Sequence, residues 1–253
     1  MPKIEISERA GVGLDGRPRP SEDHVVVLDN AVVVLDGATA PSPDLPSGGW
    51  YAGLLAKRLA NGLCARPDGD LATLLAEAIA AVAAAHDLLP GASPSSTVAM
   101  LRWTGDRVDG LVLADSPVVA FGQFGADLLF DDRLATLRRK GRLNTGAEVR
   151  ALRNADGGFW VAEADPAAAR RAVCRSWPAD TIDAVLLATD GVSVAVDDYG
   201  IFDWPQVLEI VRTQGLSAVL DAVRAAEASD PDRLRWPRAK VHDDQALIVV
   251  DFG

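Results

Sequence analysis

The order of strand-like and helix-like segments constrains the fold of this chain more than any other feature. Short apolar or alternating runs bounded by Gly, Pro, Asn or Asp predict strands, and they occur in blocks: Lys3–Glu8, His24–Leu28 and Ala31–Leu35; then Thr97–Arg102, Arg107–Leu113, Val118–Gln123 and Ala126–Phe130; then Ala184–Ala188 and Ala246–Val250. Apolar residues at helical spacing predict paired helices between these blocks: Trp50–Leu63 and Leu71–Leu89; then Trp204–Thr213 and Ser217–Ala228. Blocks of one kind, rather than strict alternation, predict an α+β fold with antiparallel sheets.

Two stretches are less regular. Residues 131–165 are polar and rich in arginine, and they contain Gly157-Gly158, so we expect an irregular, flap-like excursion with at least one short helix. The following segment, Ala167–Cys174, predicts a brief helix. Strand candidates at both ends indicate that residues 1–253 form a single domain rather than two.

Composition narrows the class of protein. Apolar residues make up 49% of the 253 residues, which excludes a disordered chain, and the net charge of −11 makes nucleic acid an improbable partner. The two cysteines are too few for a disulfide scaffold. No signal-peptide pattern opens the sequence, and no uncharged apolar run approaches ~20 residues. We therefore expect a cytoplasmic protein without a membrane partner.

Acidic residues recur at the ends of predicted strands: Glu22-Asp23, Asp36, Asp115, Asp190 and Asp243-Asp244. One aspartate in such a place is ordinarily a turn residue. Several of them can converge at one edge of a sheet, and carboxylate oxygens are the ligands that Mg²⁺ and Mn²⁺ prefer. The pattern as a whole therefore favours a metal centre.

The motifs that carry these residues resemble, in the same order, those of the PP2C-type (PPM) metal-dependent protein serine/threonine phosphatases of the bacterial, single-domain kind. They are Ser21-Glu22-Asp23, Val34-Leu35-Asp36-Gly37-Ala38, Ser95-Ser96-Thr97-Val98-Ala99, Leu113-Ala114-Asp115-Ser116, Leu186-Leu187-Ala188-Thr189-Asp190-Gly191-Val192 and Asp243-Asp244-Gln245-Ala246. The resemblance spans about residues 1–253. It implies a four-layer α-β-β-α sandwich, in which two antiparallel sheets are flanked by helix pairs.

The resemblance also implies roles. Asp36 would bridge two Mn²⁺ or Mg²⁺ ions and so be catalytic, with Glu22 and the carbonyl of Gly37 completing the shell of one ion. Asp190 and Asp243 would hold the other, and Asp115 together with Asp190 a third. Asp23 and Asp244 would lie next to these ligands without binding a metal ion themselves.

The implied reaction is hydrolysis of phosphoserine or phosphothreonine in a protein substrate, by in-line attack of a metal-bridging hydroxide. An arginine would bind the phosphate. Arg17 and Arg19 both qualify, because the proline spacing Arg17-Pro18-Arg19-Pro20 leaves the choice open, and Arg19 is preferred. A cognate protein kinase is an expected partner.

Some residues depart from the family pattern. Ala38 and the residues after it replace a glycine and a frequent histidine, and Pro117 stands where the family has an arginine. These changes keep a second interpretation open, namely a catalytically weak, partner-binding pseudophosphatase. A haloacid-dehalogenase-type phosphatase is excluded, because neither Val34 nor Ala38 supplies the second aspartate that such enzymes need two positions from the nucleophile.

A basic cluster interrupts the acidic chain at Arg138, Arg139, Lys140 and Arg142. It is interpreted either as a solvated face or as a contact for an acidic or phosphorylated substrate segment. The sequence does not choose between the two.

Overall fold

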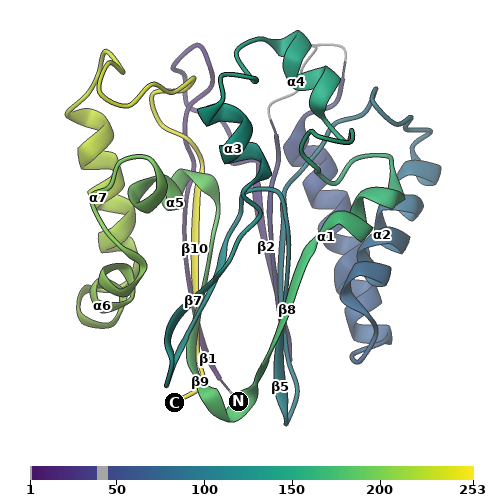
Figure 1. The fold of residues 1–253 in the computed structure, drawn as a ribbon, viewed down its shortest axis with the longest axis vertical. Coiled ribbons are helices and arrows are strands. Elements are labelled where there is room, and N and C mark those ends of the chain that lie inside the picture. Colours follow the sequence, from purple (N-terminus) through teal and green to yellow (C-terminus); the bar gives the residue numbers. More distant parts are fainter. Residues whose placement is uncertain (1, 39–44) are drawn as a thin grey trace.

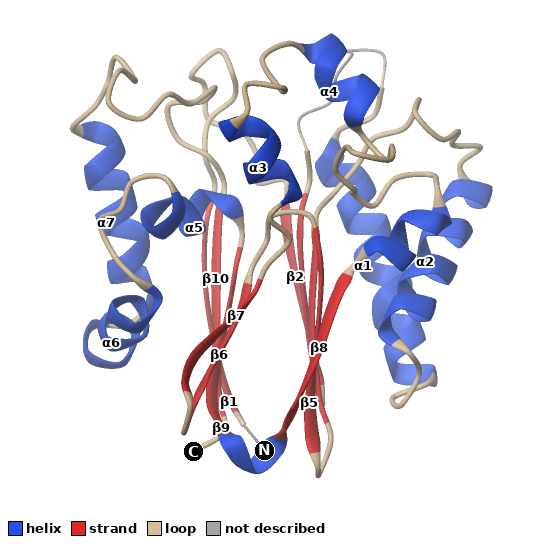
Figure 2. Ribbon diagram, in the orientation of Figure 1, coloured by secondary structure: helices blue, strands red, loops and turns tan. Residues whose placement is uncertain are grey.

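The computed structural model describes residues 2–38 and 45–253. Two five-stranded antiparallel sheets lie face to face (Figures 1 and 2). The first has the order β1 (Lys3–Arg9), β10 (Gln245–Asp251), β9 (Ile182–Ala188), β6 (Val118–Gly122) and β7 (Gly125–Leu129). The second has the order β2 (Asp23–Leu28), β3 (Ala31–Asp36), β4 (Val98–Trp103), β5 (Arg107–Leu113) and β8 (Val173–Pro178).

Helices cover the outer faces of both sheets. Helices α1 (Gly48–Ala65) and α2 (Leu71–Ala85) pack on the second sheet, and α5 (Asp190–Asp197), α6 (Trp204–Gln214) and α7 (Leu216–Ala228) pack on the first. Two short helices, α3 (Arg133–Arg139) and α4 (Gly146–Leu152), lie beyond one end of the sheets (Figure 1). The predicted four-layer α-β-β-α sandwich is confirmed.

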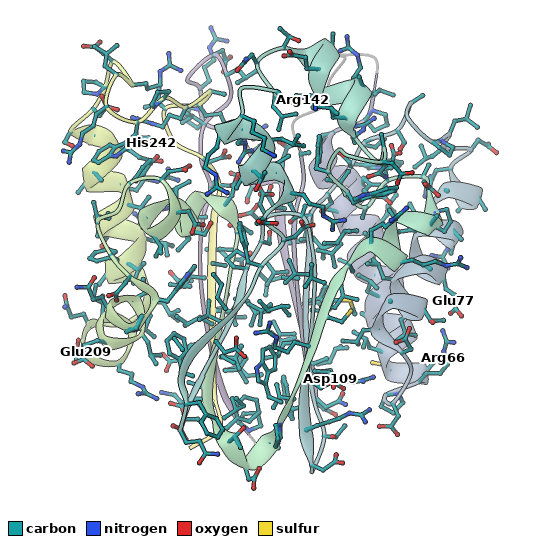
Figure 3. All side chains as sticks on the ribbon, viewed as in Figure 1. Arg66, Glu77, Asp109, Arg142, Glu209 and His242 are labelled. Carbon is teal, nitrogen blue, oxygen red and sulfur yellow. The ribbon has the colours of Figure 1, made fainter. Side chains whose placement is uncertain are left out.

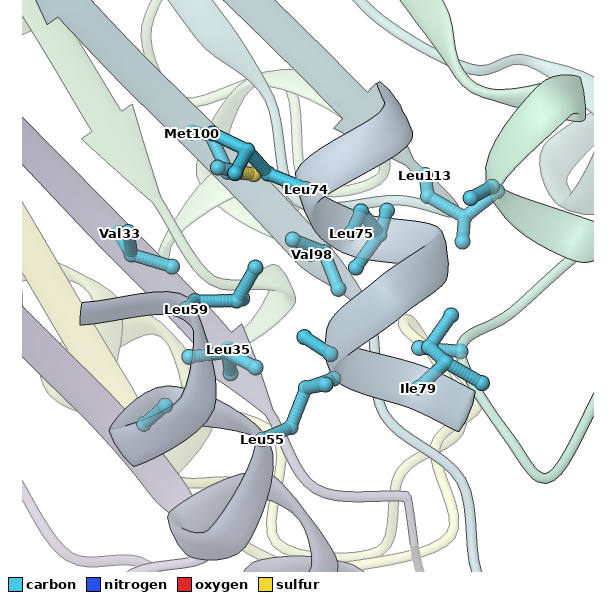
Figure 4. Close-up of a cluster of buried hydrophobic side chains, with 14 of the residues drawn as sticks. Val33, Leu35, Leu55, Leu59, Leu74, Leu75, Ile79, Val98, Met100 and Leu113 are labelled. Atoms are coloured by element: carbon cyan, nitrogen blue, oxygen red, sulfur yellow. The ribbon is translucent and has the colours of Figure 1, made fainter. Parts of the chain in front are cut away.

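Strand β3 shows why the layers form. Its side chains alternate between two cores, since successive strand residues point to opposite faces. Val32 and Val34 are buried between the two sheets, whereas Val33 and Leu35 are buried against α1 and α2 (Figure 4). Burial on both faces explains why this strand is a continuous apolar run in the sequence.

The predicted brief helix Ala167–Cys174 is confirmed for its first part and wrong at its end. A 3-10 helix spans Pro166–Arg171, and strand β8 follows it at Val173–Pro178. Arg175 and Ser176 of this strand are exposed because β8 is the edge of its sheet, so its apolar content is low. Helix α5 was also missed, because its first residues, Asp190-Gly191, look like a turn in sequence.

Across residues 2–38 and 45–253, no helix is both long enough and apolar enough to cross a membrane.

Candidate active site

Strand ends that carry acidic residues meet at the end of the sandwich beneath α3 (Figure 1). The antiparallel register places Asp23 opposite Asp36 on the neighbouring strand. Strands β4 and β5 extend to the same end of that sheet, which brings Asp115 there directly after β5. In the other sheet, Ala188 pairs with Leu247, so Asp190 and Asp243-Asp244 lie at one edge. Asp243 and Asp244 precede β10, which begins at Gln245.

Asp23 and Asp244 join the two sheets at this end. The hydroxyl of Thr189, after β9, donates to Asp23 Oδ2 at 2.8 Å, and it accepts from the N–H of Ala246 at 3.0 Å. Asp244 accepts from the N–H of Gly11 at 2.7 Å and from the N–H of Glu22 at 3.2 Å. Both carboxylates are buried, so these bonds fix the segments that carry their acidic neighbours.

Glycine backbone allows the end of β3 to approach the start of α1. The N–H of Gly37 donates to the carbonyl of Glu22 at 3.1 Å, and a Cβ on Gly37 would lie 2.4 Å from the carbonyl carbon of Gly48. The N–H of Gly49 lies 3.4 Å from Glu22 Oε1. A larger residue at position 37 would therefore push β3 away from α1 and displace the carboxylates of Glu22 and Asp36.

The carboxylates at this end raise one another's pKa. Burial raises the pKa of Asp36 well above its usual range, and the negative charges of Asp23, Asp243 and Asp115 raise it further. Burial raises the pKa of Asp190 in the same way, with added contributions from Asp36 and Asp243. Acidic groups from both sheets therefore share one electrostatic environment, and it favours cations.

Basic side chains of the chain itself occupy part of this environment. Arg19 places Nη1 2.5 Å from Glu22 Oε2 and Nη2 3.3 Å from Asp244 Oδ2. Arg138 of α3 lies 3.3 Å from Asp115. The side chain of Arg17 is 86% exposed and turns to Asp15 instead.

Lys240 is a further member that sequence reasoning missed. Its Nζ lies 2.5 Å from Asp243 Oδ1, and its side chain is only 10% exposed. Burial lowers the pKa of Lys240, but the charge of Asp243 and its hydrogen bond to the ammonium together outweigh that effect and raise the pKa. The available sequence signal was a lysine three positions before Asp243.

The donor set fits hard divalent cations, although no finished ligand cage exists. In the described part of the chain, no three His, Cys, Asp or Glu side chains already form a group that could hold a metal ion. A buried carboxylate oxygen of Asp23 nevertheless has no hydrogen-bond partner there, and the neighbouring acidic side chains all offer oxygen ligands. The residues that would hold Mn²⁺ or Mg²⁺ are thus assembled at one place, with three of them paired to internal cations.

Solved structures with the same architecture include serine/threonine phosphatases. The catalytic domain of the serine/threonine protein phosphatase PstP, in complex with two manganese ions, matches with a TM-score of 0.60 and 16% identity, over 99% of this chain and 97% of that one. PppA of Pseudomonas aeruginosa, a key regulatory component of T6SS, matches with a TM-score of 0.63 and 16% identity, over 99% and 97%. Stp1 of Staphylococcus aureus, a serine/threonine phosphatase, matches with a TM-score of 0.61 and 14% identity, over 100% and 96%.

No family model and no curated protein sequence matches the chain. The comparisons therefore show the fold of the chain, and the motif order of the sequence agrees with it. The chain has the fold of the bacterial PP2C-type (PPM) serine/threonine phosphatases.

Proposed function

We propose that this protein is a Mn²⁺- or Mg²⁺-dependent phosphatase that hydrolyses phosphoserine and phosphothreonine in proteins. The observation that carries the proposal is the set of mutually interacting acidic residues, drawn from both sheets, at one end of a PP2C-type sandwich. Asp36 is the proposed bridging ligand. Glu22 and the Gly37 carbonyl complete one site, and Asp190 and Asp243 complete the other. We treat residues 1–253 as one catalytic domain, since β1 and β10 pair within a single sheet.

Two divalent ions, when bound, supply activation of a water for attack on phosphorus and neutralisation of the phosphoryl oxygens. The protein's own part is to hold the ligands and the substrate. Asp23 and Asp244 keep the strand ends together through their bonds to Thr189, Gly11 and Glu22. Arg19 is the proposed phosphate-binding residue, and its buried Nε has no partner within the described residues, so it retains an unused donor.

Asp115 is proposed to hold a third ion together with Asp190. Burial raises the pKa of Asp115 although Arg138 opposes the shift, so a cation beside it is favoured. The manganese ions bound by PstP support the choice of a divalent metal. The proposed partners are a phosphorylated protein substrate and a cognate protein kinase.

A second candidate is a catalytically weak, partner-binding pseudophosphatase. The observation in its favour is that Arg19, Lys240 and Arg138 already neutralise Glu22, Asp243 and Asp115. In that case these three ion pairs would persist in the presence of metal ions, and the site would bind metal poorly.

One experiment separates the two candidates. Hydrolysis of p-nitrophenyl phosphate and of phosphoserine and phosphothreonine peptides is measured during a Mn²⁺ titration, with Asp36→Asn as the control. Metal-dependent turnover that is lost in the variant supports the phosphatase. A folded protein that lacks turnover at every Mn²⁺ concentration contradicts it and favours the second candidate.

A further inference from the structure

The flap segment, residues 131–165, concentrates positive charge in an acidic protein. Residues 133–153 contain seven basic residues and one acidic residue, Glu148, while the whole chain carries a net charge of −11. The seven are Arg133, Arg138, Arg139, Lys140, Arg142, Arg150 and Arg153. Such a local excess contrasts with the rest of the surface and indicates an electrostatic role.

Three of these basic residues are paired with carboxylates, and one of the pairs, Arg138 with Asp115, links the segment to the rest of the protein. Arg133 binds Asp131 at 2.6 Å, Arg138 lies 3.3 Å from Asp115, and Arg153 lies 3.5 Å from Glu163. Leu137 of α3 is also buried, in a small apolar cluster with Ala114, Phe159 and Val161. Helix α3 is therefore held in place over the candidate active site.

The other four basic residues form what we call the basic surface: Arg139, Lys140, Arg142 and Arg150. All four are exposed, and none has a carboxylate within ion-pair distance among the described residues. Figure 3 labels Arg142 at the end of the molecule that carries α3 and α4. Arg139 directly follows Arg138, which touches Asp115, so the basic surface begins within one helical turn of the site.

A cavity adjoins the basic surface. Its volume is about 420 Å³, and its charged and aromatic lining consists of Lys140, Arg133, Arg171, Asp132, Asp156 and Trp160. The guanidinium of Arg171 lies 4.7 Å from the centre of the Trp160 ring. Arg171 and Arg133 are paired with Asp156 and Asp131, so Lys140 is the lining cation without an ion-pair partner among the described residues. Beside the aromatic wall of Trp160, it suits an acidic or apolar side chain of an extended peptide.

We propose that the basic surface and this cavity dock an acidic segment of the protein substrate, next to its phosphorylated residue. This proposal rests on the proposed phosphatase function and names the preferred substrate class. A peptide whose phosphate occupies the site extends past α3, where Asp or Glu side chains meet unpaired arginines and a lysine. A nucleic acid would also meet these cations, but the acidic body around them would repel its continuous phosphate backbone.

The test compares two phosphothreonine peptides of equal length, one flanked by Asp and Glu and the other by Ser and Gln. The variant R139Q/K140Q/R142Q removes three cations of the basic surface. The control variant K57Q/R58Q/R212Q removes three exposed cations of α1 and α6, so both variants change the net charge equally. Hydrolysis of p-nitrophenyl phosphate reports on the site itself.

We expect the acidic peptide to have a kcat/KM about tenfold higher than the neutral one, as a few exposed ion pairs would give. The preference should fall in 0.5 M NaCl, disappear in R139Q/K140Q/R142Q and persist in the control variant. Turnover of p-nitrophenyl phosphate should stay unchanged in both variants. Equal kcat/KM for the two peptides, or equal loss in both variants, would overturn the proposal.

Failure of the phosphatase function gives a different result, because p-nitrophenyl phosphate is then not hydrolysed either. In that case fluorescence anisotropy with the labelled, unphosphorylated acidic peptide decides on the surface. Binding that is lost only in R139Q/K140Q/R142Q supports docking, whereas an absence of binding overturns it. Equal or tighter binding of a single-stranded DNA of the same charge would also overturn it, in favour of nucleic acid.

Discussion

Arg19 and Arg17 are two residues apart and yet differ in what they touch. Arg19 reaches Glu22 and Asp244, whereas Arg17 is almost fully exposed. Arg19→Ala should raise KM at least as much as it lowers kcat, because binding of the phosphate by a guanidinium acts in both the ground state and the transition state. A charge-assisted hydrogen bond is worth roughly 1.5–3 kcal/mol, or about 10- to 150-fold in kcat/KM.

Arg17→Ala is the matched control, and its steady-state kinetics should equal those of the unchanged protein. A large effect of Arg17→Ala with none of Arg19→Ala would reassign the phosphate to Arg17. Unchanged kinetics in both variants would remove this arginine pair from the site.

Asp36 is the proposed bridging ligand, and its charge interacts with Asp23, Asp243 and Asp115. Asp36→Asn should abolish turnover and weaken Mn²⁺ binding, since the uncharged amide does not offset the positive charge of the metal ions as the carboxylate does. Isothermal titration calorimetry measures the affinity directly. An unchanged isotherm would contradict the bridging role.

Lys240 opposes metal binding at Asp243, because its ammonium occupies that carboxylate at 2.5 Å. Lys240→Gln should therefore raise the affinity for Mn²⁺ in calorimetry. Lys140→Gln is the control, since it removes the same charge from an exposed position. The prediction fails if the two variants bind Mn²⁺ with equal affinity.

The sequence allowed acidic residues to be assigned to strand ends, because each follows or precedes a recognisable apolar run. The antiparallel register then places Asp23 beside Asp36 and Asp190 beside the segment of Asp244. The basic partners could not be assigned in this way. Arg138 and Lys240 lie on a short helix and in a loop, where the conformation of the chain, and not a period of two or 3.6, decides what a side chain meets.

At the level of single elements, the conformation of the loop between α7 and β10 is held by hydrogen bonds to Asp230. Its carboxylate accepts from the N–H groups of Leu234, Arg235 and Trp236 at 3.0–3.1 Å, and from Arg238 at 2.9 Å. Burial alone would raise the pKa of Asp230, but these hydrogen bonds outweigh it and lower the pKa to about 2. The loop that leads to Asp243 is therefore closed around one carboxylate.

This contact predicts a pH dependence. The folded-state pKa lies below the unfolded value of about 4, so the contribution of Asp230 is present above about pH 4 and is lost as the pH falls through about 2. Asp230→Asn should lower Tm at pH 7, and the difference from the unchanged protein should shrink between pH 4 and 2. Asp232→Asn, an exposed neighbour, should change little in the same thermal melts. A difference that is constant with pH would contradict the assignment.

Elements with strong periodicity could be predicted closely. Trp50–Leu63 corresponds to α1 at Gly48–Ala65, and its apolar stripe is buried against β3. Strand β8 could not be predicted, because an edge strand buries little and so needs few apolar residues. Helix α5 has only eight residues, too few for a period to be recognised.

For the molecule as a whole, metal binding should couple to folding. Ions that bind only the folded chain stabilise it by about 2.7 kcal/mol at a concentration of 100 Kd, and a protein of this size should then gain roughly 5–10 °C in Tm. Thermal melts with Mn²⁺ and with EDTA measure the shift. Asp36→Asn should lose most of it, and an equal shift in both proteins would place the bound ions elsewhere.

The pairing of β1 with β10 has a consequence for synthesis on the ribosome. Residues 3–9 are translated more than two hundred residues before their hydrogen-bonding partners, residues 245–251. In the second sheet, strands β2 to β5 pair with their neighbours in chain order, so most of its strand pairs can form before the last strands are translated. Because closure of so long a loop is slow, the nascent chain should first form a half-molecule built on the second sheet. The carboxylates of Asp36 and Asp190 then come together only when the last strand has been made.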